Sequence, residues 1–204
     1  MFMHQDVIEV FVSIDSFIKK YDSNIEMHDI IAFRDDIIMK TNNIRDMIYL
    51  KHGERASFYI TFAIYAYCDE MINQLILNID SNMSNWHLLQ EEVYQRNDGG
   101  DYFFEIIESV IDNPVFPMIV AQVLYLILAL GFKGCYVGMQ SEIDKYKNKL
   151  SAILPDQDLS NFEYNTFIDN NNFKKTYRSR ILKSLFVGIV CFPIFAYLGL
   201  WFIH

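Results

Sequence analysis

The chain has 204 residues, enough for one ordinary domain with a sizeable core and too few for two large ones. Hydrophobic residues make up 52% of it and charged residues 21%, a balance that excludes intrinsic disorder and low-complexity assemblies. The formal net charge is −9, but five of the 17 basic residues lie within residues 174–183, so residues 1–173 carry a net charge of −14. So acidic a body would repel phosphate backbones, which argues against nucleic acid as a partner.

Apolar residues recur at helical spacing along the first 154 residues, and no strand alternation or internal repeat is present. The sequence therefore predicts an all-α body, a helical bundle of about seven helices. The expected helices cover, approximately, residues 7–21, 30–52, 55–79, 84–93, 102–111, 115–130 and 141–154.

Glycine and proline predict where several helices end. Gly99 and Gly100 favour a turn, and Asp101 is then the expected N-cap of the helix that follows. The apolar run from Val115 to Phe132 contains Gln122 and lacks a strong basic flank. We interpret this run as the central buried helix of the body, with a membrane span as the alternative.

The C-terminal segment favours a membrane anchor. Leu185 to Ile203 contains 19 residues without a charge, and such a helix would reach about 28 Å, close to the thickness of a bilayer core. Basic residues just before it mark the cytoplasmic side, so a single-pass protein with its body in the cytoplasm and its C-terminus at the far face of the membrane is expected. The flanking residues are Lys174, Lys175, Arg178, Arg180 and Lys183.

Three parts of the chain follow from this pattern: a cytoplasmic helical domain (1–155), a polar linker with the basic juxtamembrane segment (156–183) and a transmembrane anchor (184–203). The N-terminus does not resemble a signal peptide. Cys68, Cys135 and Cys191 are widely spaced in apolar contexts, and we expect three reduced, buried thiols rather than disulfides or a zinc site.

Few residue patterns suggest catalysis. His87 and Glu91 stand four apart on an expected helix, which is metal-ligand spacing, but two ligands are weak evidence and a surface polar pair is the preferred interpretation. Asp69 and Glu70 are adjacent and therefore do not share a helix face. One of them can face the core, where we expect it to form a structural ion pair. We predict no catalytic residues, no metal and no cofactor.

Four acidic residues, spaced four, three and four positions apart, line one face of the expected helix 102–111 and the residues that directly flank it. A solvated face is the simplest interpretation of this stripe, and a docking surface for a basic partner is the alternative. The residues are Asp101, Glu105, Glu108 and Asp112.

Several motifs, taken in order, resemble the DotU/TssL (IcmH-like) family of inner-membrane accessory subunits of type VI and type IVb secretion systems. The resemblance covers roughly residues 55–154, and the C-terminal anchor matches the family's layout. Gln122 and Cys135 depart from the family pattern, which has an acidic and a basic residue there. The motif residues are Asp69, Glu70, Trp86, Gly99, Gly100, Asp101, Phe103, Phe104, Gly131, Phe132, Gly134 and Tyr136.

The resemblance implies a cytoplasmic hook of two small three-helix bundles, held to the bacterial inner membrane by one C-terminal helix that ends at the periplasmic face. It implies a non-enzymatic structural subunit, with type VI favoured over type IVb, that associates with a large IcmF/TssM-like membrane protein, contacts baseplate components and self-associates. Some family members continue into a peptidoglycan-binding domain, and the end of this chain at His204 predicts no cell-wall anchoring. The motif residues would mostly set helix packing and turns.

Two other functions stay open on the sequence alone. One is a generic tail-anchored adaptor whose acidic face recruits a basic cytosolic protein. The other is a membrane-bound, metal-dependent enzyme that uses His87, Glu91 and the acidic stripe.

Overall fold

The computed structural model describes residues 5–20, 26–79 and 86–155, which all belong to one compact unit. These residues form seven α-helices and one short 3₁₀-helix, with no strand among them, so the all-α prediction is confirmed. The expected linker, basic flank and membrane anchor lie outside the described residues, as does Cys191. The elements are α1 (Gln5–Lys20), α2 (Met27–His52), α3 (Glu54–Ile79), α4 (Leu89–Tyr94), α5 (Gly99–Ile111), α6 (Met118–Ala129), η1 (Gly134–Tyr136) and α7 (Gln140–Ser151).

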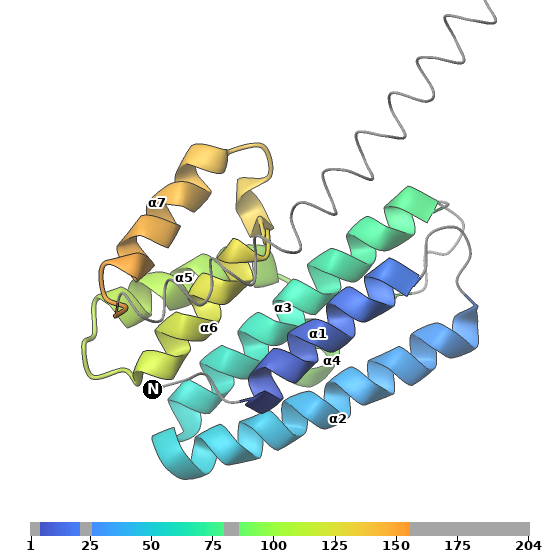
Figure 1. The fold of residues 1–204 in the computed structure, drawn as a ribbon, viewed down its shortest axis with the longest axis horizontal. Helices are drawn as coiled ribbons and strands as arrows, with labels where there is room; N and C mark the ends of the chain where they lie inside the picture. Colours follow the sequence, from blue (N-terminus) through green and yellow to red (C-terminus); the bar gives the residue numbers. More distant parts are fainter. Residues whose placement is uncertain (1–4, 21–25, 80–85, 156–204) are drawn as a thin grey trace, which may run out of the picture. The chain divides into compact units, whose positions relative to one another are not determined.

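Helix α3 is the central element of the described body (Figure 1). It packs against α1 and α2 as one group of three helices, and it also contacts α4, α5 and α6. Helices α5, α6 and α7 form the second group, with η1 against α5 and α7. The two groups correspond to the two small bundles that were predicted, and α3 joins them.

The first bundle forms because each of its helices has one apolar face. Phe17 of α1 stacks on Phe33 of α2, with ring centroids 4.0 Å apart. Farther along α2, Ile37, Ile44 and Ile48 are fully buried. Gly53 ends the helix with a φ of 84°, a conformation that glycine adopts at no steric cost. The end of α2 at His52 and Gly53 agrees with the sequence prediction.

Helix α6 forms the core of the second bundle. All residues from Ile119 to Leu128 are buried, including the polar Gln122. The stretch Met118–Tyr136 is long and apolar enough to cross a membrane by length and composition, and 61% of its most apolar window is buried inside the protein. The burial supports the predicted core helix, because a lipid-facing helix would expose its apolar side chains.

The structure corrects three local predictions. Gly99 and Gly100 do not form a turn but are the first two residues of α5, so Asp98 rather than Asp101 occupies the N-cap position. Helix α4 begins at Leu89, later than expected. Cys135 is exposed rather than buried, because it lies in η1 on the surface, whereas Cys68 is buried as predicted.

Candidate functional site

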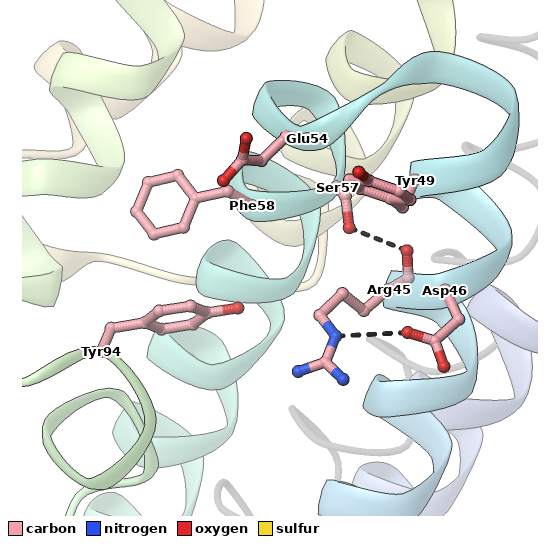
Figure 2. A pocket seen from close by; sticks show the side chains of 7 residues that line it. All are labelled: Arg45, Asp46, Tyr49, Glu54, Ser57, Phe58 and Tyr94. Atoms are coloured by element: carbon pink, nitrogen blue, oxygen red, sulfur yellow. Dashed lines mark hydrogen bonds and ion pairs between the residues drawn. The ribbon is translucent and has the colours of Figure 1, made fainter.

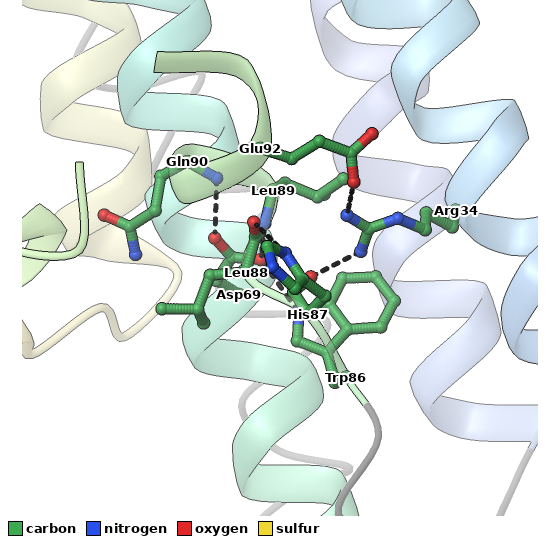
Figure 3. A network of polar contacts seen from close by, with 8 residues as sticks. All are labelled: Arg34, Asp69, Trp86, His87, Leu88, Leu89, Gln90 and Glu92. Carbon is green, nitrogen blue, oxygen red and sulfur yellow. Dashed lines mark hydrogen bonds and ion pairs between the residues drawn. The ribbon is translucent and has the colours of Figure 1, made fainter. Parts of the chain in front are cut away.

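The Asp69 carboxylate of α3 organises the start of α4. Only 1% of Asp69 is exposed. Its Oδ1 accepts hydrogen bonds from the Trp86 indole Nε1 at 2.8 Å and from the Leu89 backbone nitrogen at 2.9 Å, and its Oδ2 accepts one from the Gln90 backbone nitrogen at 3.1 Å (Figure 3). The N-cap residue of α4 is Leu88, and its side chain makes no capping hydrogen bond. Asp69 therefore caps α4 from a different helix, since it satisfies backbone donors that would otherwise lack partners.

Among the described residues Asp69 does not form the predicted ion pair, because its carboxylate accepts its hydrogen bonds from an indole and two backbone amides. Burial raises the pKa of the Asp69 carboxyl, while the bonds from Leu89, Gln90 and Trp86 oppose that rise. The net direction is upward. The group is thus a structural carboxylate, and its charge is compensated by dipoles.

Arg34 of α2 holds the same segment from the other side. Its Nη1 donates to the carbonyl oxygen of His87 at 2.5 Å and its Nη2 pairs with Glu92, while the guanidinium lies 5.0 Å from the ring centroid of Trp86. Three helices therefore meet at the start of α4, through Asp69 of α3 and Arg34 of α2. Because Arg34 lies far from this segment in sequence, no local motif signals its role.

Glu70 performs a similar task on a second loop. Its Oε2 accepts a hydrogen bond from the backbone nitrogen of Gly134 at 2.8 Å, and its Oε1 accepts one from that of Lys133 at 3.0 Å. Gln74 donates to the same carboxylate from one turn farther along α3, at 2.9 Å. Burial raises the pKa of Glu70 against the opposing effect of these donors. Glu70 thereby fixes the loop between α6 and η1.

That loop in turn packs closely on the start of α5. A Cβ added at Gly134 would lie 2.5 Å from the backbone oxygen of Gly100, and one added at Gly100 would lie 3.1 Å from the backbone nitrogen of Cys135. Phe132 and Phe103 pack beside this contact with ring centroids 4.5 Å apart. The two backbones approach this closely because neither residue at the contact carries a side chain.

The structure brings most of the motif residues into one connected region around α3, α5 and the loop before η1. Phe104 packs against Tyr136, with ring centroids 4.6 Å apart, and against Phe132 at 6.4 Å. Gly99 is buried next to the Gln90 side chain, whose Oε1 would lie 1.9 Å from a Cβ at Gly99. Asp101 is exposed on the first turn of α5.

The acidic stripe is only partly open to solvent. Asp101, Glu105 and Asp112 are exposed, whereas Glu108 is half-buried and pairs with Lys149 of α7 at 2.7 Å. Lys149 therefore neutralises one of the four charges within the chain. Whether the stripe docks a basic partner stays a prediction.

His87 and Glu91 are both exposed, but they do not share a helix face in the predicted way, since His87 precedes the first residue of α4. Among the described residues, no group of three or more His, Cys, Asp or Glu side chains could hold a metal ion.

These features describe an all-α domain in which two neighbouring carboxylates of the central helix α3 fix two other segments, the start of α4 and the loop before η1. Comparison with known proteins identifies the family within this class of domain. The family model described as type VI secretion system protein DotU matches residues 16–203, so the chain belongs to the DotU family. The family match also favours type VI over type IVb, as expected.

A solved structure supports this assignment. The chain is similar to DotU from Francisella novicida, with 29% sequence identity and a TM-score of 0.65 over 72% of this chain and 95% of that one. The search of curated proteins found no match. The protein is therefore an accessory component of a secretion system, a membrane-associated class of proteins, as the sequence resemblance implied.

Proposed function

We propose that the protein is a non-enzymatic structural subunit of the inner-membrane complex of a type VI secretion system. In this role it anchors the machine together with an IcmF/TssM-like membrane protein, contacts the baseplate and self-associates. The observation that carries the proposal is membership of the DotU family over residues 16–203.

The proposed topology rests on the sequence of the C-terminal segment. The family match extends across the uncharged segment from Leu185 to Ile203 and its basic flank. A helix of that length suits one membrane crossing, and the basic residues favour a cytoplasmic body with a periplasmic C-terminus. The parts proposed are the body (1–155), the linker and flank (156–183) and the anchor (184–203).

The described body suits a scaffold role for a physical reason. Asp69 and Glu70 each accept hydrogen bonds from backbone amides of a neighbouring segment. A partner that binds a rigid surface does not have to order it, so less binding free energy is lost. We infer that the motif residues act indirectly, by holding the surfaces that partners contact.

Removal of the anchor tests the proposal. A chain that lacks residues 184–203 should leave a folded body and abolish secretion by the native system, measured as export of its substrates into the medium. The matched control replaces the same residues with an unrelated single-pass helix of equal length and keeps the basic flank, which separates membrane attachment from sequence-specific contacts. Unimpaired secretion by the truncated chain would contradict the proposal.

A further inference from the structure

A pocket of about 400 Å³ lies where the end of α2, the start of α3 and the end of α4 meet (Figure 2). Asp46 and Tyr49 line it from α2, Glu54 and Phe58 from α3, and Tyr94 from α4. It is separate from the carboxylate network described above and shares no lining residue with it.

Aromatic rings form one wall of this pocket, and contacts below the surface hold them in place. Phe58 and Tyr94 meet edge to face, with ring centroids 5.0 Å apart. The Tyr94 hydroxyl shares a hydrogen bond with Thr61 of α3. The ring positions are therefore fixed before any ligand arrives, and the half-buried rings offer π-faces to a group that enters the pocket.

One carboxylate at the mouth of the pocket has no partner among the described residues. The Glu54 side chain makes no hydrogen bond or ion pair with them, and its carboxylate projects toward the Phe58 ring (Figure 2). Asp46 has one contact, from Nε of Arg45 at 3.4 Å, and both of these side chains are largely exposed. An unpaired carboxylate beside an aromatic wall favours a cation, because the ring face and the carboxylate both attract positive charge.

We propose that this pocket binds a basic side chain, arginine or lysine, presented by a protein partner. The cation lies between the Glu54 carboxylate and the rings of Phe58 and Tyr94. Arg45 lines the same pocket and repels the incoming charge, but 49% of its side chain is exposed, so water and salt screen the repulsion.

The surroundings of the pocket favour a polypeptide over a small cation. Tyr49, which lines the pocket from α2, is 56% exposed. An exposed aromatic side chain beside an anchoring pocket is typical of protein interfaces, where a buried side chain supplies most of the free energy and its surroundings exclude water. The proposal does not depend on which machine the protein serves, since it concerns only the chemistry of the pocket.

A titration of the full-length protein in mild detergent tests the proposal. The probe is N-acetyl-arginine methylamide, and N-acetyl-citrulline methylamide is its uncharged, nearly isosteric control. The readout is the shift of the Tyr49 and Tyr94 ring signals in protein with isotope-labelled tyrosine, assigned with Tyr49→Phe and Tyr94→Phe variants. We expect a saturable shift with the arginine probe in the millimolar range, which is usual for one exposed contact of this kind, and little response to citrulline.

Three variants make the test specific. Glu54→Gln should weaken the arginine probe about threefold to fivefold, and Arg45→Gln should strengthen it about twofold, because a like charge is removed. Glu142→Gln, on α7, should leave it unchanged. The proposal fails if citrulline matches arginine, if Glu54→Gln has no effect, if Arg45→Gln weakens the probe, or if the shifts are not confined to the pocket tyrosines.

Discussion

Adjacent residues on an α-helix point about 100° apart, and α3 uses this geometry at Asp69 and Glu70. Asp69 reaches the start of α4, and Glu70 reaches the loop before η1. Each carboxylate accepts bonds from backbone amides, which are strong donors in any sequence. One dipeptide therefore fixes two loops that lie 20 and 64 residues farther along the chain.

The raised pKa of Asp69 predicts a specific pH dependence. The folded-state pKa lies above the unfolded value of about 3.9. The folded protein therefore binds more protons between these two values, and its free energy of unfolding falls as the pH rises through that window. Asparagine does not titrate, so the stability advantage of the wild type over Asp69→Asn should shrink as the pH rises above about 4.

Urea unfolding of both full-length proteins in mild detergent, followed by circular dichroism at several pH values, measures this difference. An advantage that grows with pH would mean that the three hydrogen bonds outweigh burial and that the carboxylate pKa is lowered instead.

A second prediction concerns Arg34. Arg34→Lys keeps the charge but loses the forked contacts with His87 and Glu92 and weakens the stacking on Trp86. The free energy of unfolding should fall by about 1–2 kcal/mol. The control is Arg45→Lys, at an exposed position with one contact of 3.4 Å, where the change should stay within about 0.5 kcal/mol. Equal effects in urea unfolding would contradict the assigned role of Arg34.

At the scale of the elements, the loop after α6 contains two glycines, of which one makes the close contact with α5. Gly131 and Gly134 both have positive φ, at 101° and 51°, so alanine is strained at either position. Of the two, only Gly134 faces backbone at short range, because a Cβ added there would lie 2.5 Å from the Gly100 oxygen, whereas a Cβ added at Gly131 would have no atom within 4 Å. Alanine substitutions at these two positions therefore separate the cost of backbone strain from the cost of steric overlap.

Gly134→Ala should therefore destabilise the protein by about 2 kcal/mol more than Gly131→Ala, since a clash with backbone cannot be relieved by rotation of a side chain. Urea unfolding of the two variants gives this difference directly. Equal losses would show that the close approach of α5 to the loop does not require glycine at position 134.

The sequence predicted most helices because their apolar faces repeat with helical period, as in α2 from Ile30 to Ile48. The prediction failed where contacts between segments distant in sequence determine the local structure. Gly99 and Gly100 have the composition of a turn, but they open α5. There a Cβ at position 99 would overlap the Gln90 side chain, and one at position 100 would lie only 3.1 Å from the backbone of Gly134.

The candidate site was also predicted only in part. Helical geometry predicted that Asp69 and Glu70 face different directions, and family resemblance selected the motif residues. Their hydrogen-bond partners were not foreseen, because backbone amides leave no mark in a sequence. Arg34 was missed for a related reason, since its contacts with His87 and Glu92 lie 53 and 58 residues away.

At the scale of the whole described body, the question is whether the apolar helix α6 belongs to the protein core or spans a membrane. Its side chains from Ile119 to Leu128 are buried, and Leu124 is 0% exposed, although the helix is apolar enough to span. Leu124→Lys should therefore prevent folding, because an unpaired charge would be buried. Met118→Lys, at a position 44% exposed, should change the free energy of unfolding by about 0.5 kcal/mol or less.

Limited proteolysis of the full-length variants measures the outcome. Protection that survives Leu124→Lys would contradict the assignment of α6 to the core.

The most direct test of the central claim is to purify the tagged full-length protein from native membranes in mild detergent and identify the bound proteins by mass spectrometry. The proposed structural role predicts a large IcmF/TssM-like inner-membrane protein together with other components of the secretion machine. A matched preparation of the chain without residues 184–203 should lose the membrane partner, because the proposed anchor is removed. Recovery of the full-length protein alone, or with a single soluble partner, would contradict the account.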